Sequence, residues 1–206
     1  DGKAQECGIR IQDTQVYVAG VRQASWDVIL SQSTFRDARE GRNVTVTNVN
    51  VATLNTQLTN NPGAFGGCTF NGLVYATRMD ATPASPNGIR LINGVDVKQN
   101  MTFVTNDPVY VKGDFNIDKI DGFGTVIYAR KAVSVLADAV TVLSNNWDDA
   151  KSTLSLSQRQ AIVTTVNAAF ITGTTPSNGS TYGGGLENYL RLIENWGWYD
   201  STKAPP

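Results

Sequence analysis

The sequence predicts a mainly β protein whose body is a parallel β-helix or β-solenoid-like coil, closed by a C-terminal capping helix. Short segments alternate apolar and polar residues, as strands with one buried face do. Turns rich in Gly, Asn, Asp and Pro separate these segments at intervals of about 8–16 residues. The polar positions are mostly Asn, Thr and Ser, which suit exposed sheet faces. Because no strict repeat is present, an antiparallel β-sandwich or β-roll is the alternative.

The N-terminal segment, residues 1–42, is predicted to mix strands with a helix. The stretch "IRIQDTQVYVAG" alternates apolar residues and indicates strands. The stretch "SWDVILSQSTFRDAREG" predicts a helix that begins after Ser25 as N-cap and ends at Gly41.

Residues 43–145 are predicted to form the β-rich body. The alternation in "RNVTVTNVNV" indicates a strand, and Asn50 then caps a short helix with Leu54 and Leu58 one turn apart. Further strands are expected in "GLVYA", "GIRLINGVDV", "MTFVTNDPVYVKGDF", "TVIYA" and "AVSVLADAVTVLS". Their corners carry Asn-Gly, Asp-Pro or Gly, which suits the turns between the strands of a solenoid.

Residues 146–206 are predicted to close the chain, with a helix over 186–196. The stretch "LENYLRLIENW" gives this helix a broad apolar stripe, and Glu187 and Arg191 form an i,i+4 pair. Since a solenoid must cover its ends to avoid strand-to-strand aggregation, this helix is expected to act as a cap.

Charge and hydropathy argue against nucleic acid and membranes as partners. Only 17% of the 206 residues are charged and the formal net charge is −1, so nothing favours nucleic acid or an anionic membrane as partner. No apolar run approaches the ~18 residues of a membrane span. The first residues, "DGKAQECGIR", are not a signal peptide. We therefore expect an extracellular or cell-surface protein whose targeting segment has already been removed.

The chain has two cysteines, Cys7 and Cys68, and no histidine. Without histidine the Ser-His-Asp and Cys-His arrangements are excluded, and two thiols alone do not make a tetrahedral zinc site. The choice is a disulfide or two buried thiols. A disulfide is favoured, because Cys7 lies near a terminus and Cys68 in the glycine-rich loop "FGGCTF", and it would indicate an oxidising compartment.

The nearest approach to a metal site is the acidic cluster of Asp114, Asn116, Asp118 and Asp121. Its D-x-N-x-D start matches the first half of an EF-hand loop, but Lys119 replaces the glycine and Thr125 the bidentate glutamate. An EF-hand is rejected and a looser calcium site is the weaker alternative. The favoured interpretation is a solvated corner whose side chains bond their own backbone, so no cofactor is expected.

Paired carboxylates would be needed by a glycoside hydrolase or polysaccharide lyase. The acids available are Asp107, Asp114, Asp138, Asp148 and Asp149, with Lys112, Arg130 and Lys131 as bases or charge stabilisers. Sequence alone does not place any two of the acids at the separation of about 5 or 7–9 Å that glycoside hydrolysis requires, and surface Asp and Lys residues are common. We therefore expect no enzyme, with such a hydrolase or lyase as the alternative.

Several stretches in order carry a family resemblance: "VTVTNVNVATLNTQL", "NGLVYA", "GIRLINGVDV", "MTFVTNDPVYVKGDFN", "KAVSVLADAVTVLSNNWDDA", "TTVNAAFITG" and "YGGGLENYLRLIENW". Over about residues 44–198 the chain resembles the exported C-terminal region of bacterial type IV pilus assembly-associated proteins, which have a PilX-type, minor-pilin-like N-terminal segment. The family pattern has Asn-Pro where this chain has Asp107-Pro108. The sequence shows no hydrophobic pilin helix, a departure that bears on pilus assembly.

The resemblance implies a non-catalytic, extracellular, β-helical surface domain on or near a filament. We accordingly expect a structural or adhesive cell-surface protein that associates with itself or with other surface or filament subunits. The aromatic residues Trp196, Trp198 and Tyr199 are the predicted partner contacts. The alternative is carbohydrate binding or cleavage, with exposed Trp and Tyr rings stacked on sugars.

Overall fold

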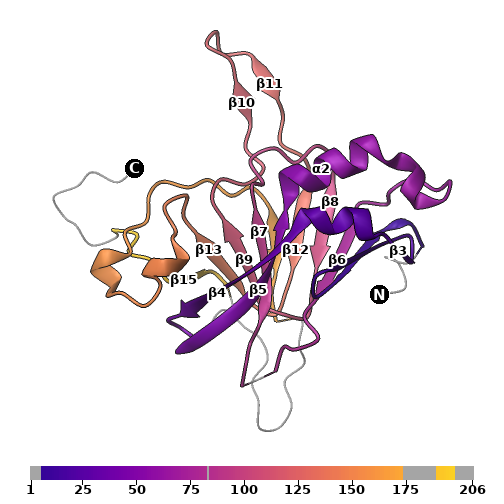
Figure 1. Ribbon diagram of the computed structural model, residues 1–206. Coiled ribbons are helices and arrows are strands. Elements are labelled where there is room, and N and C mark those ends of the chain that lie inside the picture. The colour runs from indigo at the N-terminus through magenta and orange to yellow at the C-terminus, as the bar shows by residue number, and fades with distance from the viewer. Residues whose placement is uncertain (1–5, 83, 174–188, 198–206) are drawn as a thin grey trace.

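The computed structural model describes residues 6–82, 84–173 and 189–197 (Figure 1). Its helices are α2 (Val51–Asn60) and the 3₁₀ helices η1 (Ala24–Ile29), η2 (Pro62–Phe65), η3 (Asp149–Lys151) and η4 (Leu156–Gln158). Its strands are β1 (Ile9–Gln12), β2 (Gln15–Val18), β3 (Val21–Arg22), β4 (Leu30–Asp37), β5 (Arg42–Asn50), β6 (Leu73–Thr77), β7 (Gly88–Ile92), β8 (Met101–Val104), β9 (Val109–Lys112), β10 (Lys119–Ile120), β11 (Val126–Tyr128), β12 (Val133–Leu136), β13 (Val140–Leu143), β14 (Ala169–Ile171) and β15 (Arg191–Leu192).

The protein is mainly β, as predicted, and its two large sheets mix parallel and antiparallel pairs. The first sheet has the order β14-β12-β8-β6-β1-β2-β3 and the second β15-β13-β9-β7-β5-β4. Neighbours from β1 to β14 and from β5 to β15 are parallel, whereas β2, β3 and β4 add antiparallel pairs. From β6 onward, strands of the first sheet alternate along the chain with strands of the second. The antiparallel sandwich alternative is therefore wrong.

The two sheets share one hydrophobic core, built from side chains in register on successive strands. In the first sheet Val74, Phe103 and Val135 are direct partners, and each is almost fully buried. In the second sheet Leu91 and Val111 are partners and lie in the same core cluster. Stacking similar apolar side chains along neighbouring strands buries them continuously, which is the main stabilising term of such a sheet.

The helix predicted after Asn50 is present as α2. The Asn50 side chain accepts a hydrogen bond from the N–H of Thr53, at 3.1 Å, and so satisfies one of the free amides of the first turn. Leu54 is fully buried in the core and Leu58 packs against it. The N-cap and the spacing of the two leucines thus predicted this element correctly.

The helix predicted between Ser25 and Gly41 is wrong. Only Ala24–Ile29 are helical, as the 3₁₀ helix η1. Leu30–Asp37 form β4, which pairs antiparallel with β5. The physical reason is tertiary packing. The ring of Phe35 lies edge-on to Tyr110, with centroids 5.0 Å apart, a contact made possible by the extended chain.

The predicted C-terminal helix over 186–196 is also wrong where the structure describes it. Residues 186–188 lie outside the described part, and Arg191–Leu192 form β15, parallel to β13. Ile193 is buried, and the carboxylate of Glu194 accepts hydrogen bonds from the N–H and hydroxyl of Ser144, at 2.6 and 2.7 Å. Strand pairing and this buried carboxylate outweigh the helical pattern of the sequence.

The outer side of the second sheet carries a buried polar network centred on Arg90. Its guanidinium forms two hydrogen bonds with the carboxylate of Asp149, at 2.6 and 3.0 Å. It also donates to the side chains of Asn48 and Ser33, at 2.7 and 2.6 Å. The indole N–H of Trp147 donates to the same carboxylate at 2.7 Å. The network joins β4, β5 and β7 to the segment after β13.

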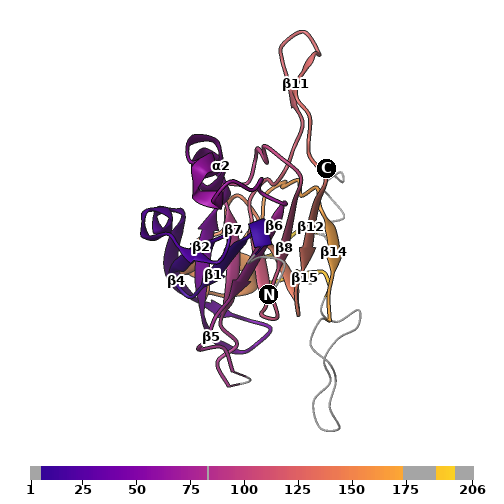
Figure 2. The same ribbon diagram turned by 90° about the vertical axis from the view of Figure 1, so that its right-hand side faces the viewer.

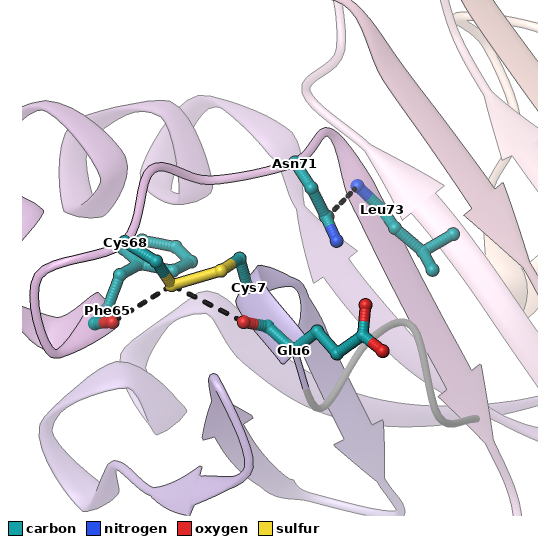
Figure 3. Close-up of a disulfide and its surroundings, with 6 residues drawn as sticks. All are labelled: Glu6, Cys7, Phe65, Cys68, Asn71 and Leu73. Atoms are coloured by element: carbon teal, nitrogen blue, oxygen red, sulfur yellow. Dashed lines mark hydrogen bonds between the residues drawn. A yellow bond between two sulfur atoms is a disulfide. The ribbon is translucent and has the colours of Figure 1, made fainter.

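The predicted disulfide between Cys7 and Cys68 is present, with the Cα atoms 6.1 Å apart (Figure 3). It ties the residues just before β1 to the loop after η2, across a sequence separation of 61 residues. The Cys68 sulfur lies 3.1 Å from the carbonyl oxygen of Phe65, and Asn71 donates its N–H to the carbonyl of Cys7. The bond therefore holds two chain segments that also pack on the core.

Candidate functional site: the projecting hairpin and the groove at its base

The β10–β11 hairpin is the one long excursion from the described body, between β9 and β12 (Figures 1 and 2). Lys119 pairs with Tyr128 and Ile120 with Val126, with an irregularity between the two pairs. In both views the hairpin extends well beyond the ends of the neighbouring strands. A two-stranded ribbon has no hydrophobic core of its own, so its position depends on how its base is held.

Asp121 shapes the tip of the hairpin. Its carboxylate accepts hydrogen bonds from the N–H groups of Phe123 and Thr125, at 2.9 and 2.8 Å. Gly124 closes the turn with a φ of 84°, a conformation that glycine adopts without strain. The N–H groups of Thr125 and Phe123 lower the pKa of Asp121, so the tip carries a negative charge at neutral pH.

The hairpin exposes apolar side chains that a soluble protein normally buries. Phe123 is 97% exposed at the tip, and Ile127 is 65% exposed. Ile120 and Val126, which face each other across the ribbon, are also exposed. Single exposed apolar residues are common, so the four on this short projection make it a candidate interaction surface.

The base of the hairpin is held by Asn116, which is 1% exposed and has a φ of 54°. Its side-chain amide accepts from the N–H of Lys131 at 2.8 Å and donates to the carbonyls of Lys131 and Asn167, at 2.8 and 2.9 Å. Asp118 accepts from the N–H of Arg130 at 2.7 Å. These bonds join the incoming and outgoing legs of the hairpin and attach both to the body.

A second set of contacts fixes one side of the base. The ammonium of Lys119 lies 2.7 Å from the carboxylate of Asp96, and the hydroxyl of Tyr128 donates to the carbonyl of Val97. The hairpin therefore leaves the body in a defined direction, with its tip far from its own attachment.

At the base of the hairpin lies a groove of about 800 Å³ on the first sheet. It runs across the beginnings of β6, β8, β12 and β14, and its lining includes Leu73, Thr102, Lys131, Ser134, Val166 and Ala169. The hydroxyls of Thr102 and Ser134 bond each other at 2.9 Å. Besides apolar surface, the groove offers a ligand the cations Arg130 and Lys131 and the amides of Asn100 and Asn167.

The structure places the four residues of the predicted acidic cluster in separate roles. Asp114 accepts from the N–H of Thr165 at 2.8 Å, while Asn116, Asp118 and Asp121 bond the hairpin backbone as described. Within the described ranges, no group of three or more Asp, Glu, Cys or His side chains is arranged to hold a metal ion. A looser calcium site stays the weaker alternative.

The predicted catalytic carboxylates do not gather at one place. Asp148 caps η3 by accepting from the N–H of Ala150, and Asp149 binds Arg90. Asp107 and Asp138 follow β8 and β12 at equivalent corners, where the N–H of Asp138 lies 3.3 Å from the Asp107 carbonyl. Their proximity reflects the stacking of successive corners. Of the predicted bases, Lys112 lies on β9, while Arg130 and Lys131 belong to the hairpin base.

Asp107 is buried, and its surroundings predict an unusual pH dependence. Burial raises its pKa, although the N–H of Arg78, at 2.8 Å from the carboxylate, opposes the rise. An acid with a raised folded-state pKa stabilises the fold less as pH rises through the ordinary aspartate range. The Asp107→Asn variant keeps an oxygen that can accept from Arg78 but does not ionise.

We therefore expect Asp107→Asn to gain in stability relative to wild type as pH rises above 3.8, the ordinary pKa of an aspartate. Urea unfolding at a series of pH values measures this difference. A difference between variant and wild type that is the same at every pH would show that Asp107 has no raised pKa in the folded protein.

The predicted partner residues are only partly described. Trp196 is half-buried, and its indole nitrogen is buried with no hydrogen-bond partner among the described residues. Trp198 and Tyr199 lie outside the described residues. The sequence reasoning missed Phe123, although the flanking glycines in "DGFGT" indicate a turn, and turns usually lie at the protein surface.

No protein-family model, curated protein or solved structure matches this chain. Among the described helices, none is long and apolar enough to cross a membrane. The resemblance to pilus-associated proteins stays a prediction.

Proposed function

We propose that the protein is a non-catalytic structural or adhesive subunit of the cell exterior, built as a short β-solenoid that binds another protein through the β10–β11 hairpin. The alternation of strands between two largely parallel sheets supports the solenoid interpretation. The disulfide between Cys7 and Cys68 supports an oxidising, exported environment. The resemblance to pilus-associated proteins agrees with a place on or near a filament.

The observation that carries the proposal is the almost fully exposed ring of Phe123 on a projection whose base is rigidly held. A protein partner suits this tip better than a lipid bilayer does. The ionised Asp121 next to the ring would have to enter an apolar phase, which is costly for a charge without a partner. A protein surface can bury the ring and still solvate or pair the carboxylate.

A photo-reactive amino acid in place of Phe123, in the whole protein made by its native cells, tests the proposal. We expect a covalent adduct with another protein chain. Protease added to intact cells should digest this adduct, which would show that it lies on the cell exterior. The matched control is the same amino acid in place of Met79, which is 67% exposed at a distant corner. Protein that is protected inside the cell, or equal adducts from both positions, would contradict the proposal.

Carbohydrate binding is the second candidate function, because amide and hydroxyl groups line the groove. Much of their bonding capacity is already used inside the protein. Asn100 accepts from the N–H of Ala132, and Asn167 accepts from Arg130 and donates to the carbonyl of Asn116. A glycan array decides between the two candidates: a specific hit, weakened by Ser134→Trp in the groove, would favour carbohydrate, and silence would favour the structural role.

A further inference from the structure

The tip of the hairpin and the groove at its base are complementary. The tip presents Phe123 and Ile127 as apolar groups and Asp121 as an anion. The groove presents apolar wall residues such as Leu73 and the cationic Lys131. Within the described residues the Lys131 ammonium forms no salt bridge, and it lies 5.9 Å from the centroid of the Tyr128 ring.

A chain cannot fill its own groove with its own tip. The bonds of Asn116 and Asp118 fix both legs of the hairpin beside the groove, and the tip points away from the body in both views. From Arg130 to Phe123 the extended chain spans roughly 20 Å at about 3.3 Å per residue. The occupant of the groove must therefore come from another molecule.

A second copy of the chain, related to the first by a two-fold axis, could fill the groove. If two hairpins lie side by side in opposite directions, each tip reaches the base of the other hairpin, where the groove lies. The arrangement is a closed, isologous dimer in which every contact occurs twice. It also covers exposed edges of the ribbon, because in the described sheet β10 and β11 pair only with each other.

We propose that two copies of this chain associate by reciprocal docking of their β10–β11 hairpins. Phe123 of each copy enters the groove of the other, and Asp121 lies beside Lys131 of the second copy. The proposal rests on the proposed function in so far as it takes the hairpin as a protein-binding element, and it names the partner.

Sedimentation velocity of the purified whole chain over a concentration series tests the apolar contact. Wild type should form a dimer, and Phe123→Ser with Ile127→Thr should raise its dissociation constant by at least about 100-fold, because each buried aromatic anchor is lost twice. Both side chains are exposed, so the variant should unfold at the same urea concentration as wild type. The Met79→Ser control should sediment as wild type does.

Charge variants test the register of the dimer. Lys131→Glu places a carboxylate near Asp121 and should weaken the dimer by about 10-fold or more. Asp121→Asn keeps an oxygen for the N–H groups of Phe123 and Thr125, so the turn survives. When Asp121→Asn is combined with Lys131→Glu, the double variant should recover part of the lost dimer affinity. Lys151→Glu, an exposed lysine on η3, is the control and should leave the dimer unchanged.

The outcomes separate this inference from the proposed function. A monomeric wild type, or a dimer indifferent to the tip variants, overturns the reciprocal dimer, even if Phe123 cross-links to a different surface protein. Flotation of wild type, but not the Phe123 variant, with phosphatidylcholine–phosphatidylglycerol vesicles would also overturn it in favour of a lipid partner. A hairpin-dependent dimer in protein that stays inside the cell would uphold the inference and refute the proposed location.

Discussion

Replacing Asp149 by alanine is expected to lower the free energy of unfolding by about 3 kcal/mol or more, because it leaves a buried guanidinium without its counter-ion. The Arg90 side chain is only 6% exposed, and Asp149 meets it with two hydrogen bonds. The Trp147 indole N–H would lose the same acceptor. Urea unfolding at pH 7 measures the loss.

Asp148→Ala is the matched control, since this neighbouring carboxylate is exposed and caps only the short helix η3. Its removal should lower stability by about 1 kcal/mol, the usual value of a cap. The double variant Arg90→Met with Asp149→Ala should lose less than Asp149→Ala alone, because no charge then stays buried. Equal losses for the two aspartate variants would show that the pair has no special role.

The Asp149 effect should also depend on pH. Burial alone would raise the pKa of this carboxyl, but the hydrogen bonds and charge of Arg90 outweigh burial and hold it below its ordinary value of 3.8. An acid with a lowered folded-state pKa stabilises the fold above its unfolded-state pKa and loses this contribution as pH falls. The difference between Asp149→Ala and wild type should therefore be full at pH 6–7 and shrink below about pH 4.

Removal of the disulfide by Cys7→Ser with Cys68→Ser is expected to lower the free energy of unfolding by about 4 kcal/mol. The crosslink closes a loop with a sequence separation of 61 residues, so it strongly restricts the unfolded chain. Folded-state contacts of the bridged segments, such as the bond from the Asn71 N–H to the Cys7 carbonyl, are not removed by the substitution. Urea unfolding with and without reductant measures the effect.

Reductant should bring the wild type to the stability of the double-serine variant and leave that variant unchanged, which is the internal control. An unchanged unfolding midpoint in the variant would contradict the prediction. Mass spectrometry of protein from its native source, alkylated before reduction, should find no modified cysteine if the chain folds in an oxidising compartment.

Local pattern predicted several elements well because neighbouring residues determine them. Asn50 and the spacing of Leu54 and Leu58 identified α2, and a cap is a bond between residues three apart. The alternation of apolar residues around Met101 and Val133 identified β8 and β12, in which buried and half-buried residues alternate. In these segments the buried face lies where a period of two residues places it.

The same patterns failed where distant contacts decide the conformation. The stretch around Phe35 reads as a helix, yet Tyr110 and Trp147 provide an aromatic pocket that only an extended β4 fills. The stretch around Ile193 also reads as a helix, yet β13 supplies a strand edge and Ser144 supplies donors for Glu194. In neither case is the deciding partner near in sequence.

The candidate site shows the same division. Of the residues after β9, Asp121 bonds backbone two and four residues away, as expected for a turn. Asp114 and Asp118 instead accept from the more distant N–H groups of Thr165 and Arg130, and Asn116 is buried, not solvated. That Asn116 joins Lys131 to Asn167 was beyond sequence reasoning, because Asn167 is 51 residues away. The exposure of Phe123 and the groove beside Lys131 likewise depend on how strands from four parts of the chain lie together.

The sequence by itself determined the β-rich class, the first long helix, the pairing of its only two cysteines and the turn chemistry of the corners. These features depend on composition and on contacts between near neighbours. The order of strands in the two sheets, the extended form of β4 and β15, the Arg90 network and the projecting hairpin were decided only by tertiary structure. Their free energy comes from burial and hydrogen bonding between residues far apart in the chain, which no local pattern encodes.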